Sequence, residues 1–178
     1  MIPRRNGFTI VELLIAMSLV SFLLIALGFG MKASMQTYDE NDRLAQTTQA
    51  ARVVLTRMTT EIRTANAVTA TSNADGTTAT ITITPPTGNA GNVTQIRYTY
   101  RDGTLKYAQT ANGTTTESVL MGADEDVHVT AVKVAEEIGE DADGNPAVVN
   151  VVVTLQLTNG NVDNAHTISV SPRRVQRY

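Results

Sequence analysis

Glu12 is a charged side chain in an otherwise apolar stretch of the sequence. Residues 8–31 read FTIVELLIAMSLVSFLLIALGFGM, and the next charge along the chain is Lys32. An aspartate at a membrane centre costs about 2.5–3.5 kcal/mol on insertion scales, although the helix dipole favours an acid in the first turn of a helix. Because such residues are retained where a partner offsets the cost, we expect Glu12 to pair with a cation. The alternative is a plain membrane anchor in which Glu12 extends toward the lipid headgroups.

The two histidines are the next candidates for chemistry. His128 and His166 fall in segments that we predict to be strands, and neither has an acidic residue at ligand spacing beside it. The chain has no cysteine, which excludes disulfides, cysteine-based zinc sites and a cysteine nucleophile. Neither a G-x-S-x-G elbow nor a phosphate-binding loop occurs. We therefore predict that the protein is not an enzyme and has no catalytic residues and no cofactor.

An acidic run between two predicted strands is the candidate for metal binding. Asp141, Asp143 and Asn145 follow the D-x-D-x-N opening of a calcium loop. The required glycine is displaced, since Gly144 stands two positions early, and Val152 occupies the position of the bidentate glutamate. These departures favour a solvated acidic hairpin loop without metal, and a calcium site is the alternative.

The overall charge argues against one class of partner. The chain has 14 Lys and Arg against 17 Asp and Glu, a net charge of −3, and its aromatic content is 4%. A mildly acidic chain has no general attraction for nucleic acid, and few aromatic side chains are present to stack on bases. A nucleic-acid partner is therefore not expected, although the basic C-terminal residues 172–178 could contact an acidic loop of a neighbouring subunit or, in a competence system, DNA.

A membrane-spanning helix is predicted over residues 8–31. At 1.5 Å per residue its length is ~36 Å, enough to cross about 30 Å of hydrocarbon. Arg4 and Arg5 precede it and should stay in the cytoplasm, which places the rest of the chain on the far side of the membrane. A secretory signal has a shorter apolar core and a small-residue cleavage site, which Gly28 and Gly30 match poorly. The two glycines predict either a local melt of the helix or close packing against another helix.

The start of the chain resembles a known processing signal. The residues GFTIVELL, which follow the basic leader 1–7, resemble the prepilin signature of type IV pilins and type II secretion pseudopilins. The resemblance implies that a prepilin peptidase cleaves between Gly7 and Phe8 and methylates the new N-terminal Phe8. It also implies that the freed amine of an incoming subunit pairs with Glu12 of its neighbour, which makes Glu12 the assembly residue. The other implied partners are further pilins and an assembly platform in the inner membrane.

An amphipathic helix is predicted to continue over residues 32–67, where neither proline nor glycine occurs. Apolar side chains recur at helical spacing along one stripe, and most charged side chains fall outside it. The stripe consists of Leu44, Ala51, Leu55, Met58, Ile62 and Ala65. We expect this half of the helix to pack on the protein's own head domain. The alternative, a separate coiled-coil stalk, requires a longer repeat.

Residues 68–178 are predicted to form a β-rich head. Short runs of alternating β-formers are separated by turn residues, with D-G and N-G signals at 102–103 and 159–160. A long helix followed by antiparallel strands is an α+β fold, and it fits the pilin architecture. The predicted strands are residues 79–84, 93–100, 105–109, 118–121, 127–134, 148–158 and 167–171.

Two functions fit these features. The first is a structural subunit of a type IV pilus or type II secretion pseudopilus, held in the inner membrane by a single pass with its C-terminal domain extracytoplasmic before assembly. A resemblance of residues 55–65 to minor pilins of the W-type and minor pseudopilins of the J-type favours a minor subunit. The second is a binding module at the fibre tip that recognises a surface, an exported substrate or DNA. Tyr98, Tyr100 and Tyr107 suit either such a binding face or cross-strand packing.

Overall fold

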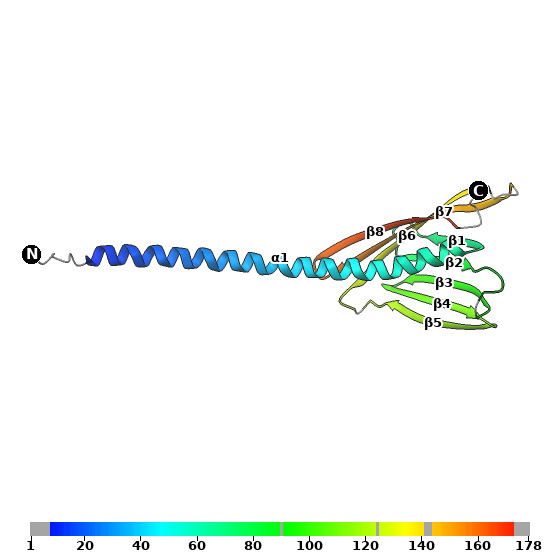
Figure 1. Ribbon diagram of the computed structural model, residues 1–178, viewed down its shortest axis with the longest axis horizontal. Helices are drawn as coiled ribbons and strands as arrows, with labels where there is room; N and C mark the ends of the chain where they lie inside the picture. Colours follow the sequence, from blue (N-terminus) through cyan, green and yellow to red (C-terminus); the bar gives the residue numbers. More distant parts are fainter. Residues whose placement is uncertain (1–7, 90, 124, 141–143, 173–178) are drawn as a thin grey trace, which may run out of the picture. The chain divides into compact units, whose positions relative to one another are not determined.

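The computed structural model describes residues 8–89, 91–123, 125–140 and 144–172. Within these ranges, helix α1 (Ile10–Thr64) is followed by eight strands, and Figure 1 shows their order along the chain by colour. The chain divides into two compact units, residues 1–42 and residues 43–178. The strands are β1 (Ala67–Ser72), β2 (Thr78–Thr84), β3 (Val93–Arg101), β4 (Thr104–Ala111), β5 (Thr114–Met121), β6 (His128–Glu140), β7 (Pro146–Asn159) and β8 (Val162–Val170).

Helix α1 confirms the predicted continuation beyond the apolar segment. It passes through Gly28 and Gly30 without a break in the single chain, and a local melt in the fibre or close packing against another helix stay predictions. The helix ends at Thr64, three residues before the predicted end, because the backbone from Asn66 onward forms hydrogen bonds with β2 and no longer with the preceding helical turn. The amide of Asn66 donates to the carbonyl of Thr84 at 2.8 Å, which commits the next residues to the β1–β2 ladder.

The first five strands form one antiparallel sheet in sequence order, β1-β2-β3-β4-β5. The predicted turn between β3 and β4 is confirmed, since Asp102 and Gly103 have φ values of 51° and 75°, as a type I′ turn requires. The turn between β4 and β5 has the same conformation at Asn112 and Gly113, and we did not predict it from the sequence. Strand β1 was also not predicted. Its buried and exposed positions alternate, but most of its side chains are small, so the sequence shows no clear hydrophobic alternation.

The last three strands form a second antiparallel sheet, β6-β7-β8, and the predicted α+β fold of a long helix with antiparallel strands is confirmed. The edges of β1 and β6 lie next to each other. The hydrogen bonds between them are formed by side chains with the backbone and not by a regular ladder between the two backbones. The Ser72 hydroxyl donates to the Val134 carbonyl (3.1 Å) and accepts from the Val134 amide (3.0 Å). Glu136 accepts a hydrogen bond from the amide of Ala70. These insertions divide the strands into two sheets.

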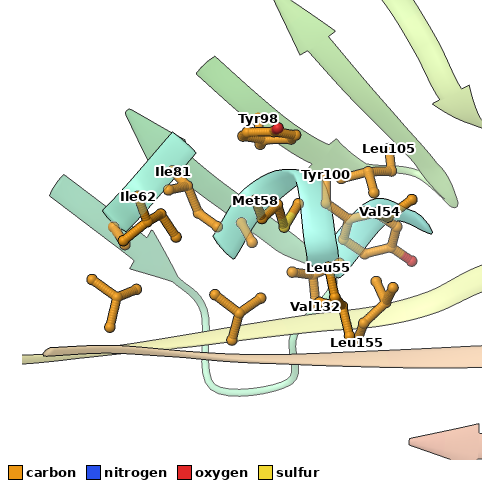
Figure 2. Close-up of a cluster of buried hydrophobic side chains, with 14 of the residues drawn as sticks. Val54, Leu55, Met58, Ile62, Ile81, Tyr98, Tyr100, Leu105, Val132 and Leu155 are labelled. Carbon is orange, nitrogen blue, oxygen red and sulfur yellow. The ribbon is translucent and has the colours of Figure 1, made fainter. Parts of the chain in front are cut away.

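The hydrophobic core of the head lies between α1 and the two sheets. Figure 2 shows Leu55, Met58 and Ile62 of the helix among side chains from β2, β3, β6 and β7. The predicted stripe is correct from Ala51 onward and wrong at Leu44, which is 43% exposed. The buried helical positions are Thr47, Ala51, Val54, Leu55, Met58 and Ile62.

The tyrosines pack between the helix and the five-stranded sheet, and this contradicts a tyrosine binding face. Tyr98 and Tyr107 are buried and meet edge to face, with ring centroids 5.4 Å apart. The Tyr98 hydroxyl donates to Glu61 at 2.5 Å, and the Arg57 guanidinium lies 3.7 Å from the centre of the Tyr107 ring. These contacts fix one flank of α1 to β3 and β4. Tyr100 is also buried, and its hydroxyl donates to the carbonyl of Val129.

Candidate functional site at the start of the helix

The first turn of α1 is closed by reciprocal hydrogen bonds between Thr9 and Glu12. The Thr9 amide and hydroxyl each donate to Oε2 of Glu12 at 3.0 Å, and the Glu12 amide donates to the Thr9 hydroxyl at 3.3 Å. This is a capping box, in which the side chains at the N-cap and N3 positions satisfy amides that the helix leaves unpaired. The T-x-x-E spacing of Thr9 and Glu12 in the sequence is the signal that predicts such a box.

The two oxygens of the Glu12 carboxylate differ. Oε2 accepts both hydrogen bonds from Thr9, whereas Oε1 accepts none from the residues that the structure describes. The carboxylate is therefore oriented by its own helix and still has one oxygen available to a further donor. An ionised carboxylate has about four acceptor positions, so the Thr9 contacts do not exhaust it.

The helix around Glu12 has no partner within its own unit. Every side chain from Phe8 to Gln46 is exposed. The exposed large apolar side chains include Phe8, Ile10, Leu14, Phe22, Leu24 and Phe29. Contiguous apolar surface of this extent is typical of protein–protein or membrane contacts. By length and composition this helix could cross a membrane.

The predicted cleavage site lies at the edge of the described residues. Gly7 and the basic residues of the predicted leader are outside them, so the expectation for that bond stays a prediction. Phe8 is the first described residue, and its side chain is 80% exposed. Phe8, Thr9 and Glu12 thus stand together on one accessible helix end, as their spacing indicates.

The other candidates from the sequence gain no support as metal sites. Among the described ranges, no cluster of three or more His, Cys, Asp or Glu side chains could hold a metal ion. Asp141 and Asp143 of the calcium candidate lie outside these ranges, and the position of the bidentate glutamate is Val152 within β7. His128 and His166 lie on β6 and β8, far from Glu12 in the sequence.

Comparison with known proteins yields one match. A family described as the prokaryotic N-terminal methylation motif matches residues 2–28, the segment that contains Gly7, Phe8 and the capping box. No curated protein and no solved structure matches the chain. The motif implies processing by the prepilin peptidase and assembly with other pilins. The first residues of the chain therefore carry a prepilin-type methylation motif, at the start of a helix that is long and apolar enough to cross a membrane.

Proposed function

We propose that the protein is a minor structural subunit of a type IV pilus or type II secretion pseudopilus. The observation that carries this proposal is the apolar helix of residues 10–31, which buries none of its side chains within its own chain. Before assembly this helix would hold the protein in the inner membrane as a single pass, with residues 43–178 extracytoplasmic. In the fibre, the helices of neighbouring subunits would replace the lipid.

The geometry of the capping box supports a specific assembly step. Cleavage between Gly7 and Phe8 would free a cationic amine on Phe8, which the peptidase then methylates. The Oε1 atom of Glu12 has no described donor and would accept a hydrogen bond from the amine of an incoming subunit. Oε2 would stay bound to Thr9. In an apolar helix bundle, a pair of this kind fixes the register of two subunits, because an unpaired buried charge costs roughly 3–5 kcal/mol.

The proposal of a minor subunit rests on the sequence of residues 55–65 and on a polar head without a disulfide loop. This segment resembles the W-type and J-type minor subunits, and in the fold it forms the last turns of α1 over the core. The alternative role as a tip-located binding module gains no support from the tyrosines, because they are buried.

The test of the proposed function is the mass and N-terminal sequence of the protein recovered from native membranes and from sheared surface fibres. The expected chain begins at N-methylated Phe8 and occurs in sheared fibres as a small fraction of the major subunit. A chain that still begins at Met1, or one cut near Gly30, would overturn the fibre function. A correctly processed chain that is the most abundant protein of the fibre would overturn the minor class alone.

A further inference from the structure

A groove of about 630 Å³ runs along the head between α1 and β8. One wall is a stripe of the helix that includes Arg52, Thr56, Thr60 and Arg63, and the opposite wall is formed by His166 and Ile168 of β8. Leu55 contributes an apolar side chain to the lining. All of these residues belong to the unit of residues 43–178, so the groove is a feature of the head by itself.

The groove exists because α1 covers only part of the three-stranded sheet. On β7, the inward-facing Val153 and Leu155 are fully buried. Their partners on β8, Ile168 and His166, face the same side and are only half-buried. Strand β8 is the edge of its sheet, and no further strand among the described residues pairs with its free side. The helix therefore leaves an apolar floor beside an open strand edge.

Three polar groups of the groove, the guanidinium groups of Arg52 and Arg63 and Nε2 of His166, have no partner among the residues that the structure describes. Neither Arg52 nor Arg63 forms an ion pair there, and Nε2 of His166 is buried without a hydrogen bond. The opposite flank of the helix differs, because Arg57 is bound there by Glu61 at 3.3 Å and by the ring of Tyr107. The groove thus presents two unpaired cations on its helical wall together with two apolar side chains, Leu55 and Ile168, which suits an acidic partner with an apolar side chain.

The same head carries a segment with an exposed apolar side chain between acidic residues, which complements the groove. Strands β6 and β7 continue as a two-stranded ribbon beyond the end of β8, whose last residue Val170 pairs with Val151 (Figure 1). Ile138 on this ribbon is 68% exposed, the highest value among the exposed large apolar side chains of the head. The exposed carboxylates of Glu137 and Glu140 flank it, and within the described residues neither forms an ion pair.

We propose that the β6–β7 ribbon of one copy docks in the α1–β8 groove of the next copy. Ile138 would cover the apolar floor at Leu55 and Ile168, and the ribbon carboxylates would pair with Arg52 and Arg63. Ribbon and groove are different surfaces of the same chain, so the contact is heterologous and repeats from copy to copy as an open helical filament. The inference rests on the proposed fibre function and assigns the head surfaces that meet in the fibre.

The absence of native cysteine allows a direct test by disulfide crosslinking in full-length protein. A chain that carries both Thr56→Cys and Ile138→Cys should form a ladder of disulfide-linked dimers, trimers and longer oligomers in assembled fibres under mild oxidation. Each single variant lacks one of the two contacting cysteines and should give dimers at most. The control pairs Thr56→Cys with Val119→Cys, because Val119 is comparably exposed (56%) but lies on β5 in the other sheet.

A charge-reversal series is the second readout. Arg52→Glu with Arg63→Glu should lower the amount of sheared fibre by about tenfold, since each partly exposed ion pair contributes modestly to binding. Adding Glu137→Arg and Glu140→Arg in the same chain should restore most of the loss, which a merely misfolded head would not allow. Reversal of Arg101, which ends β3 and whose described partner is Asp102 in the β3–β4 turn, is the matched control and should leave assembly unchanged.

The outcomes separate this inference from the fibre function. Processed protein in sheared fibres with no ladder above the Val119 control would overturn the ribbon–groove contact and leave the fibre function intact. Unprocessed protein that is absent from fibres, again with no ladder, would overturn both. A ladder from the double variant together with rescue by the compensating charges would support the contact.

Discussion

The helix α1 contains two parts with the same backbone conformation and opposite burial. From Phe8 to Gln46 every side chain is exposed, whereas from Thr47 onward every third or fourth side chain is buried against the sheets. The first part is the more apolar of the two, so hydrophobicity alone does not decide which part its own chain covers. The second part is covered because strands of the same chain supply a complementary face. Every described side chain of the first part is exposed, and apolar surface of this extent is typical of contacts with lipid or with other proteins.

This comparison assigns different roles to residues of similar type. Glu12 and Glu61 are both glutamates on α1, and each accepts a hydrogen bond from a hydroxyl group. Besides the hydroxyl of Tyr98, Glu61 has a second partner in its own head, the guanidinium of Arg57. Glu12, in contrast, keeps one carboxylate oxygen without a described donor. Substitutions in the first part should therefore affect assembly, and substitutions in the second part should affect the stability of the head.

The largest effect is expected at Glu12. Glu12→Gln preserves the shape and an acceptor for Thr9 but removes the charge, so an incoming amine would be left unpaired in the bundle. Fibre assembly should fall by about a hundredfold or more, which corresponds to the roughly 3–5 kcal/mol lost when one partner of a buried pair is removed. The amount of sheared fibre measures this, and thermal unfolding of the head should not change.

A control at the capping residue sharpens this prediction. Thr9→Val removes the hydrogen bonds of the hydroxyl and keeps the charge of Glu12, so its effect should be limited to about 0.5–2 kcal/mol of helix capping. Equal losses of fibre for Glu12→Gln and Thr9→Val would show that capping, and not charge, is the role of Glu12.

The next prediction concerns the free energy of unfolding of the head when one isoleucine is truncated in each part of the helix. Ile62 is fully buried beneath the sheets, and Ile25 is 56% exposed in the apolar part. Ile62→Ala should destabilise the head by about 2–5 kcal/mol, through lost burial and the cavity that remains. Ile25→Ala should leave head unfolding unchanged. The measurement is urea unfolding of the detergent-solubilised chain, followed by near-UV circular dichroism of the tyrosines. Equal destabilisation by the two variants would contradict the division of the helix.

A smaller effect is expected from one hydroxyl group on the flank of the helix. Tyr98→Phe removes the hydrogen bond to Glu61, whose side chain is only 18% exposed, and should cost about 1.5–3 kcal/mol because the acceptor is charged. Tyr107→Phe is the matched control, since its hydroxyl donates to the neutral Gln109 at 2.9 Å and should cost about 0.5–1.5 kcal/mol. The same unfolding assay ranks the two variants, and the reverse order would show that Arg57 alone neutralises Glu61.

Local signals carried most of the fold prediction. The apolar run, the absence of proline and glycine over residues 32–67, and the D-G turn each depend on neighbouring residues, and each is confirmed. The turn at Asn112 and Gly113 had an equally local signal that we did not use. Leu44 fits the periodicity as well as Thr47 does, but the helix meets the sheets only from Thr47 onward.

Non-local features could not be predicted from the sequence. The division into two sheets depends on Ser72 and Glu136 reaching across an edge, between strands more than sixty residues apart. The α1–β8 groove likewise combines Arg52 and Arg63 with His166, which no spacing in the sequence relates. For the candidate site, sequence reasoning found Glu12 and Phe8 but missed the orienting role of Thr9, although the T-x-x-E pattern was present.

The smallest predicted effect is a loss of head stability at alkaline pH. Burial raises the pKa of Tyr98 well above its usual range, and the hydrogen bond to Glu61 and the charge of that carboxylate raise it further. Because the phenol stays neutral in the folded head and ionises near pH 10 in the unfolded chain, the stability it contributes is fully present below pH 10. This stability declines as pH rises, by about 0.4 kcal/mol at pH 10 and by up to about 1.4 kcal/mol per further pH unit.

Burial also raises the pKa values of Tyr100 and Tyr107, so all three tyrosines act in the same direction. Urea unfolding at pH 8, 10 and 11 measures the decline, and Tyr98→Phe should reduce its slope because this variant has one ionisable phenol fewer. A Tyr98→Phe head with the full slope would show that Tyr98 is not the tyrosine that resists ionisation. No equivalent dependence is expected from residues 10–31, which contain no tyrosine, so the alkaline loss belongs to the head, whose strands β3 and β4 carry the three tyrosines.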